Sequence, residues 1–196
     1  TTNFNTASQV ALDGENDVVG CMVGVAEKRH IFNPKNVKKG DMLVGLPSSG
    51  LHTNGYSLAR KVLLEKYSLG ETVEGFYSAL GEELLRPHKS YSKNVFSLMN
   101  KVKIKGIAHI TGGGLLENVP RVLPEKLSFE IDNESWQVPQ IFKLIQKTGS
   151  ISDYEMFRAF NMGVGLVLVV SKSDAKKTIS NLSKLGEKAF VLGKVI

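Results

Sequence analysis

Two glycine-bearing loops hold the residues of this sequence that could bind an anion or move a proton. The first loop, at residues 48–57, reads SSGLHTNGYS and lies between a predicted strand and a predicted helix. Its glycines would let the backbone approach a ligand closely, and its hydroxyl and amide groups could hydrogen-bond phosphate or ribose. The alternative is a plain turn in which Asn54 caps the following helix. The candidate binding residues in this loop are Ser49, Gly50, Asn54 and Gly55.

The second loop, at residues 109–118, reads HITGGGLLEN, and its three glycines follow a predicted strand and open a predicted helix. Amides that no Cβ atom shields could form an anion cradle there. The glycine spacing is neither that of a P-loop, which ends in Gly-Lys-Ser/Thr, nor that of the dinucleotide-binding fingerprint. A flexible turn is the alternative interpretation. The candidate binding residues in this loop are His109, Thr111, Gly112, Gly113 and Gly114.

The four histidines show no spacing that is typical of a metal site. No pair is four residues apart, and the single cysteine, Cys21, adds no second ligand type, so we expect no metal site. His52 and His109 lie in the two loops and could contact phosphate or transfer a proton near neutral pH. His30 and His88 lie among turn residues, where we expect exposed side chains without a chemical role.

A third glycine-bearing turn reads NMGVG at residues 161–165 and precedes a predicted strand. It adds Asn161 as a candidate binding residue, although its glycines could also serve turn geometry and packing alone. The acidic side chains show no arrangement that singles out a pair. A mechanism with two carboxylates therefore has no support in this sequence.

Composition narrows the class of protein. The 25 basic and 19 acidic side chains leave a net charge of +6, and the one tight basic cluster is Lys101, Lys103 and Lys105. This is too sparse for a nucleic-acid surface, so the surplus favours a small phosphorylated ligand or simply solubility. The apolar runs are far shorter than the roughly 20 residues of a membrane span, and no secretory signal is visible. One cysteine excludes an internal disulfide and fits a cytoplasmic location.

Strand and helix patterns are interleaved along the chain without strict alternation. Strands are expected at residues 18–26, 42–46, 104–110, 127–131, 164–170 and 189–192. The first of these is rich in valine and is typical of a strand buried on both faces. Helices are expected at 58–63, 82–85, 91–102, 115–119, from Pro139 onward, from a capping box at Ser152, and at 175–185. This order predicts an α+β domain in which a mixed sheet is packed by helices.

Several long motifs closely resemble aminoimidazole ribonucleotide synthetase, the phosphoribosylformylglycinamidine cyclo-ligase family of purine biosynthesis. They are GDMLVGLPSSGLHTNGYSLARKVL at 40–63, AHITGGGLLENVPRVLP at 108–124, SW at 135–136 and EMFRAFNMGVG at 155–165. The similarity runs from about Asp17 to the C-terminus. Formylglycinamidine synthetase, selenophosphate synthetase, thiamine monophosphate kinase and the hydrogenase maturation ATPase share parts of these motifs.

The resemblance implies an elaborated ferredoxin-like C-terminal domain over residues 33–196. Residues 1–32 would be a remnant of the family's N-terminal domain, with its last strand at about 18–28. That domain supplies most ATP and metal ligands through acidic, glycine-rich segments, and this sequence contains no such segment. We therefore expect that the isolated chain does not turn over ATP.

For function, the resemblance implies ATP-dependent closure of formylglycinamidine ribonucleotide to aminoimidazole ribonucleotide. His52 would be the catalytic residue, and the loop residues named above would hold ribose-phosphate or nucleotide phosphates. ATP and Mg would be cofactors, bound mostly by the N-terminal domain, and the complete enzyme would be a cytoplasmic homodimer without nucleic-acid or membrane partners. The alternatives are a non-catalytic ligand-binding or interaction module, the equivalent domain of a related ATP-using synthetase, and a structural remnant that self-associates.

Overall fold

The computed structural model describes residue 21, residues 23–28 and residues 31–196, and the chain divides into two units, Thr1–Ile31 and Phe32–Ile196. In the first unit the described residues form no strand, and Val23 and Val25 are 91% and 102% exposed. The predicted strand, at 18–26 from the residue pattern and to about 28 from the resemblance, is therefore wrong over its described part, while residues 18–20 and 22 lie outside the described residues. A valine-rich segment becomes a buried strand only when neighbouring strands and helices cover it.

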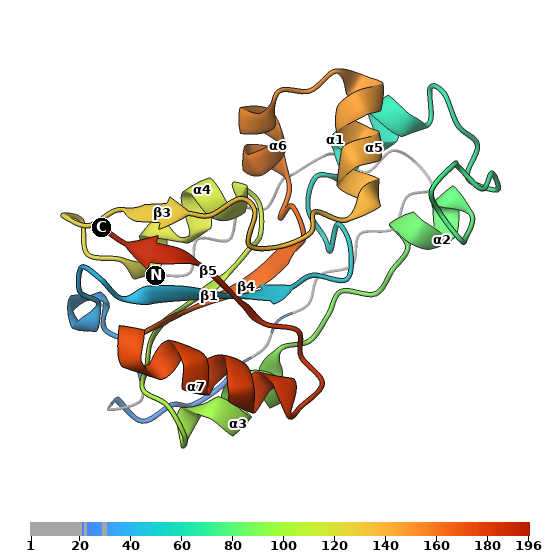
Figure 1. Cartoon of the computed structure of the whole chain (residues 1–196). Coiled ribbons are helices and arrows are strands. Elements are labelled where there is room, and N and C mark those ends of the chain that lie inside the picture. Colours follow the sequence, from blue (N-terminus) through green and yellow to red (C-terminus); the bar gives the residue numbers. More distant parts are fainter. Residues whose placement is uncertain (1–20, 22, 29–30) are drawn as a thin grey trace. The chain divides into compact units, whose positions relative to one another are not determined.

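The second unit is built on a five-stranded sheet in the order β2-β4-β1-β5-β3 (Figure 1). The strands are β1 (Met42–Pro47), β2 (Ile104–His109), β3 (Phe129–Ile131), β4 (Val164–Val170) and β5 (Phe190–Val195). All four pairings between neighbouring strands are antiparallel, whereas a mixed sheet was expected from the interleaved pattern. The α+β class itself is confirmed.

The antiparallel sheet follows from two interleaved strand–helix–strand units. Strands β1 and β2 run in the same direction but are separated by β4, and strands β4 and β5 run in the same direction but are separated by β1. Each parallel relationship thus spans a strand of the other unit, which is the arrangement of a ferredoxin-like fold. The elaboration is the segment between β2 and β4, which contributes β3 as an edge strand beside β5.

In the part of the chain that the structure describes, seven α-helices pack on the sheet and on one another. Helices α3 (Ser92–Met99) and α7 (Lys172–Ser183) lie together on one face (Figure 1). The helices on the other side are α1 (Tyr56–Leu63), α4 (Gly114–Asn118), α5 (Gln140–Gly149) and α6 (Asp153–Ala159). The short helix α2 (Leu80–Leu84) lies in the long connection from α1 to α3. None of the described helices is both long enough and apolar enough to span a bilayer.

The position of the interior strand β4 explains why its sequence is apolar throughout. All seven of its residues are buried, because helices cover both faces of the sheet at this position. On one face Leu168 belongs to a core with Leu98 of α3 and Leu182 of α7. On the other face Val167 belongs to a core with Leu115 of α4. A strand covered on both sides reads as a continuous apolar run rather than an alternating one.

Two predicted helix starts are refined by the structure. The Ser152 hydroxyl accepts a hydrogen bond from the Glu155 amide at 3.4 Å, which confirms Ser152 as the N-cap of α6. The Glu155 carboxylate instead pairs with Arg158 at 2.7 Å, so only half of the capping box forms. Pro139 is the N-cap residue of α5 rather than a residue of its first turn.

Candidate functional site

The three glycine-bearing loops meet because of the register of the sheet. Strand β1 ends where Pro47 pairs with Val164, and β2 ends where His109 pairs with Leu166. The Ser48 amide then donates to the Gly163 carbonyl at 2.8 Å, and the Ile110 amide donates to the Gly165 carbonyl at 3.0 Å. Both loops that leave β1 and β2 are therefore tied to the turn that enters β4, and all the predicted binding loops lie at one edge of the sheet.

Asn161 joins the first loop to the third turn. Its Nδ2 donates to the carbonyls of Gly50 and Leu51 at 2.9 and 3.1 Å, and its Oδ1 accepts from the Ser48 hydroxyl and the Gly163 amide. The side chain is only 3% exposed. Because both ends of this amide are already used inside the protein, Asn161 positions the first loop rather than offering a group to a ligand.

Asn118 does the same for the triple-glycine turn, and sequence reasoning missed it. Its Nδ2 donates to the carbonyls of Thr111, Gly112 and Gly114 at 3.3, 3.1 and 2.8 Å. Its Oδ1 accepts from the Thr111 hydroxyl at 3.2 Å. The signal in the sequence was an asparagine in the helix that follows the glycines, but an exposed surface residue would look identical there.

The glycines of this turn are required by close packing. Gly114 has φ +58°, and a Cβ atom there would collide with the Phe157 carbonyl oxygen. The carbonyls of the turn face Asn118, while the amides of Gly112 and Gly113 have no hydrogen-bond acceptor in the described chain. Adjacent unpaired amides are the groups that an oxyanion would use.

The first loop borders this cradle at Asn54. A Cβ atom on Gly112 would lie 3.2 Å from the Asn54 Nδ2, which places this side chain against the glycine turn. The N-cap residue of α1 is Gly55, with φ +81° and no side-chain cap bond, so Asn54 does not cap the helix. Its amide has no hydrogen-bond partner among the described residues and is available to a ligand.

Three histidines form a cluster beside these loops. The rings of His52 and His88 stack with centroids 4.0 Å apart, and the Nε2 atoms of His88 and His109 are 3.1 Å apart. The Thr53 hydroxyl lies 3.5 Å from the His88 Nδ1. His88 is exposed, as expected, and it lies against His52 and His109. It follows helix α2 in the sequence, and only the folding back of that connection brings it to the loops. His30 lies outside the described residues.

His52 is more buried than a loop histidine was expected to be. It has φ +62°, is 4% exposed and accepts a hydrogen bond at Nε2 from the Ser49 amide at 3.1 Å. Its Nδ1 is buried and has no hydrogen-bond partner. Burial, followed by the nearby charges of His88, His109 and Lys89, lowers the pKa of His52 to about 4. The expectation that this imidazole titrates near neutrality is therefore wrong, because the unprotonated ring is the form that burial favours.

His109 is also affected by its surroundings. Partial burial, and then the charge of His88, lower its pKa from the ordinary value. It ends β2 and is exposed at the edge of the sheet. At neutral pH His52 and His109 are thus both favoured as neutral imidazoles that accept or donate single hydrogen bonds.

Tyr91 is a second residue that sequence reasoning missed as part of the site. Its hydroxyl donates to the Pro47 carbonyl at 2.9 Å, and its ring lies 6.2 Å from the ring of His52. Burial, and then the charge of Glu187, raise its pKa. Gly165 of β4 makes room for both rings, since a Cβ atom there would collide with the Tyr91 hydroxyl and lie 2.6 Å from the His52 Cε1. A glycine inside an otherwise apolar strand was the signal for this close approach.

Two of the predicted hydroxyl ligands are engaged within the protein. The Ser49 hydroxyl donates to the Pro87 carbonyl at 2.6 Å, which holds the segment carrying His88 against the first loop. The Thr111 hydroxyl donates to Asn118, as described above. The groups that remain available to a ligand are the amides of Gly112 and Gly113, the Asn54 amide and the edges of the histidine cluster.

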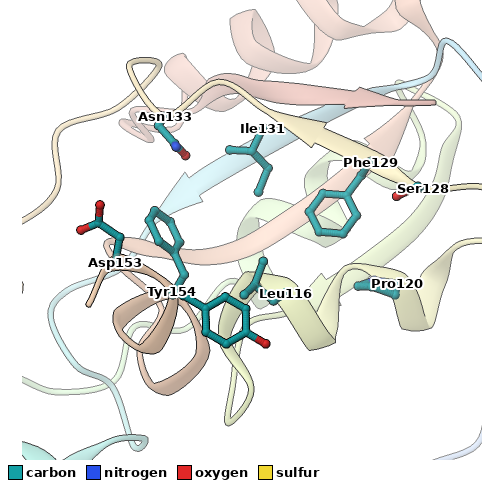
Figure 2. A pocket seen from close by; sticks show the side chains of 9 residues that line it. Leu116, Pro120, Ser128, Phe129, Ile131, Asn133, Asp153 and Tyr154 are labelled. Carbon is teal, nitrogen blue, oxygen red and sulfur yellow. The ribbon is translucent and has the colours of Figure 1, made fainter. Parts of the chain in front are cut away.

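A pocket of about 510 Å³ opens beside the histidine cluster. It is lined by His88, Lys89, Ser90, Tyr91, Ser92, Val95, Phe96, Ile107, His109 and Leu166. A second pocket of about 650 Å³ lies elsewhere, between α4, β3 and α6 (Figure 2). In Figure 2 the side chains of Leu116, Phe129 and Ile131 face its interior, with Asp153 and Asn133 at one end. No predicted site residue lines this second pocket, so it is not part of the candidate site.

The histidine cluster also changes the expectation about metals. Among the described residues, the three histidines are the one place where at least three potential metal ligands come together. One ring nitrogen of each histidine lies within 4.8 Å of those of the other two. The sequence spacing of 36 and 21 residues hid this arrangement, because the three histidines come from two loops and a strand end. Imidazole nitrogens suit zinc and similar ions and are poor ligands for Mg²⁺, which prefers oxygen.

Comparison with known proteins gives one family over most of the chain. Residues 38–196 match the family described as "AIR synthase related protein, C-terminal domain". A phosphoribosylformylglycinamidine cyclo-ligase of Bacillus pumilus is 51% identical over 183 residues, which are 92% of this chain and 53% of that protein. One of Pseudothermotoga lettingae is 49% identical over 182 residues, 93% of this chain and 54% of that protein. The chain thus spans about half the length of these relatives.

A solved structure of lower identity shares the fold. The hydrogenase maturation protein HypE in complex with ATP superposes with a TM-score of 0.56 at 15% identity, covering 84% of this chain and 44% of that one. At this identity the likeness concerns the fold alone, and it agrees with the elaborated ferredoxin-like arrangement.

Proposed function

The chain belongs to the family of AIR synthase related proteins, C-terminal domain, and from this we propose that it forms the C-terminal half of a phosphoribosylformylglycinamidine cyclo-ligase. The observation that carries the proposal is the identity of about half of all residues to proteins of that name over nearly the whole chain. The three loops that the sheet brings together are the part of the fold that would face the substrate.

The proposed reaction closes the imidazole ring of formylglycinamidine ribonucleotide at the expense of ATP. The formyl oxygen attacks the terminal phosphoryl group of ATP, and ADP leaves. The amidine nitrogen then attacks the former formyl carbon, phosphate leaves with that oxygen, and protons lost from nitrogen and carbon restore an aromatic ring. Phosphorylation is the step that turns a poor leaving oxygen into a good one.

We propose that this chain contributes an anion cradle and a neutral imidazole to that site. The free amides of Gly112 and Gly113 would bind a phosphate of the substrate or nucleotide, and the adjacent Asn54 amide would hydrogen-bond ribose or phosphate oxygen. His52, with its low pKa, would be neutral at pH 7, and because its Nε2 accepts from the Ser49 amide, its Nδ1–H would be the group that donates a hydrogen bond or a proton to the substrate. Asn161 and Asn118 would hold these loops in place.

Of the two expected cofactors, the described residues offer ligands for the phosphates of ATP but not for magnesium. A nucleotide phosphate fits the unpaired glycine amides. Magnesium has no fitting oxygen cluster among the described residues, where the one group of three potential ligands is made of imidazoles. We therefore propose that any Mg is held by the other half of the complete enzyme. A homodimeric state and a cytoplasmic location are further parts of this proposal, drawn from the family resemblance.

A chimera tests the proposal directly. Residues 38–196 would replace the matching half of the Bacillus pumilus relative, and formation of aminoimidazole ribonucleotide would be measured. We expect the chimera to be active and the isolated 196-residue chain to be inactive, because the chain covers only about half of that relative. A folded chimera without activity, beside an active parent enzyme, would contradict the assignment.

The same chimera tests the role of His52. His52→Ala should lower kcat/KM by roughly 10²-fold or more, which is the low end of a general acid–base contribution. A loss confined to KM would assign His52 to uniform substrate binding instead. The control is Lys176→Ala at an exposed position of α7, outside the three loops, which should leave the kinetics unchanged. His88 is not a suitable control, since it stacks on His52.

A further inference from the structure

The histidine cluster, His52, His88 and His109, has the composition of a transition-metal site, and its ring nitrogens lie close enough for one ion after local adjustment. The Nε2 atoms of His88 and His109 are 3.1 Å apart, and a ring nitrogen of each histidine lies within 4.8 Å of those of the other two. Ligand nitrogens about 2.0–2.1 Å from a tetrahedral ion lie roughly 3.3 Å from one another. We propose that these three imidazoles bind one divalent transition-metal ion of the zinc type.

The unpartnered nitrogen of His52 is an independent reason for a ligand at this place. Its Nδ1 is buried with no hydrogen-bond partner, although buried polar atoms nearly always have one. Its Nε2 already accepts from the Ser49 amide, so in the metal-free protein the proton lies on Nδ1. A metal bond at Nδ1 would replace that proton and satisfy the buried atom.

Metal binding requires two local changes, a rotation of the His88 ring and a shift of the proton on His52. His88 stacks on His52 at an interplanar angle of 19°, and its ring must turn so that its nitrogen points at the ion. Its side chain is exposed on the segment between α2 and α3, and the rotation would exchange its stacking on His52 and its contact with the Thr53 hydroxyl for a bond to the metal. When Nδ1 of His52 binds metal, its proton moves to Nε2, and the Ser49 amide must release that nitrogen.

The fourth coordination position would face solvent rather than protein. His88 and His109 line the pocket of about 510 Å³ described above. Three protein nitrogens and one open position that takes water are a common arrangement for zinc. The ion class follows from the ligands, since three neutral imidazoles select Zn²⁺, Co²⁺ or Ni²⁺ over Mg²⁺ and Ca²⁺.

The test is a zinc titration of the complete 196-residue chain without an affinity tag. Cys21→Ser and His30→Gln form the reference background, because a free exposed thiol and the fourth histidine could bind zinc independently. We expect one Zn²⁺ per chain without dimerisation, and a visible spectrum of tetrahedral cobalt when Co²⁺ is used instead. His52→Asn, His88→Ala and His109→Ala should each weaken binding by at least about tenfold, since even partners of metal ligands are worth 10- to 100-fold.

A matched control and a second readout protect the result from misfolded variants. Arg86→Ala changes an exposed side chain two residues from His88 and should leave zinc affinity unchanged. In the reference protein, which carries only Cys21→Ser and His30→Gln, NMR signals of the three imidazoles and of the Ser49 amide should shift together when Zn²⁺ is added. Mg²⁺ should not shift them. Unchanged affinity in His88→Ala, a shift of one imidazole only, or one zinc shared between two chains would overturn the proposal. The outcome does not depend on the cyclo-ligase activity.

Discussion

At the scale of single residues, the site is set by which polar groups are already used inside the protein. The side-chain amides of Asn161 and Asn118 donate to loop carbonyls, and the Ser49 hydroxyl donates to the Pro87 carbonyl. The groups left for a ligand are the backbone amides of Gly112 and Gly113, the side-chain amide of Asn54 and the edges of the histidine cluster. Whether a polar group is already hydrogen-bonded inside the protein therefore indicates its function better than its residue type does.

The burial of His52 predicts a stability that depends on pH. The folded protein keeps this ring neutral down to about pH 4, whereas the unfolded chain protonates it near the ordinary pKa of 6.5. Between these values the unfolded state binds more protons, so the free energy of unfolding should fall on acidification by up to about 1.4 kcal/mol per pH unit. Urea unfolding from pH 7 to pH 5, with a chelator present, measures this slope.

The matched variant for this slope is His52→Asn, because asparagine tolerates the left-handed φ of +62° at this position. It should flatten the dependence above pH 5, where most carboxylates remain charged. His88, His109 and Lys89 also face the ring and contribute to the slope through their charges. An equal slope in both proteins would show that His52 is not the group responsible.

The triple-glycine turn predicts a weak oxyanion site. Titration with inorganic phosphate should shift the amide signals of Gly112 and Gly113, because these amides have no acceptor in the described chain. Gly112→Val should abolish the shifts without unfolding the domain, since its Cβ atom would meet only the Asn54 Nδ2, at 3.2 Å. Gly114 is unsuitable, because any Cβ there meets backbone. Phosphate titration without a shift between Ile110 and Leu116 would exclude the cradle.

At the scale of elements, β4 is the strand that connects β1 to β2 and contributes to the cores on both faces of the sheet. It pairs with both β1 and β2 and is buried along its length. Leu168→Ala should lower the free energy of unfolding by about 2–5 kcal/mol, through lost burial and a residual cavity. Val191→Ala on β5, where the side chain is 37% exposed, should cost less than about 1 kcal/mol. Chemical denaturation of both variants checks the contrast, and similar losses would contradict the central role of β4.

At the scale of the whole molecule, the described core lies in one of the two units. Every buried apolar residue that the structure describes falls between Val37 and Val195. A chain shortened to Phe32–Ile196 should therefore unfold cooperatively, with a Tm within about 3 °C of the 196-residue chain, since about 1 kcal/mol shifts Tm by 2–4 °C at this size. Loss of a cooperative transition in calorimetry would show that the first 31 residues stabilise the domain.

The sequence by itself determined the elements of the second unit and the family. The apolar run at 164–170, the helix stripes and the capping serine at 152 are local patterns, and each corresponds to an element found in the structure. The long motifs around the glycines identified the family because several of them match it at the same spacing. These features depend on residues close together in the chain.

The tertiary structure alone decided which residues share the site and how the strands are directed. His88 stacks on His52 from 36 positions away, and Asn161 hydrogen-bonds a loop more than 100 residues earlier. The Asn161 contact follows from the register of β1 on β4, and the His88 contact follows from the connection between α2 and α3 folding back onto the first loop, neither of which a local pattern encodes. The low pKa of His52 has the same origin, because burial depends on what the rest of the chain places around a residue.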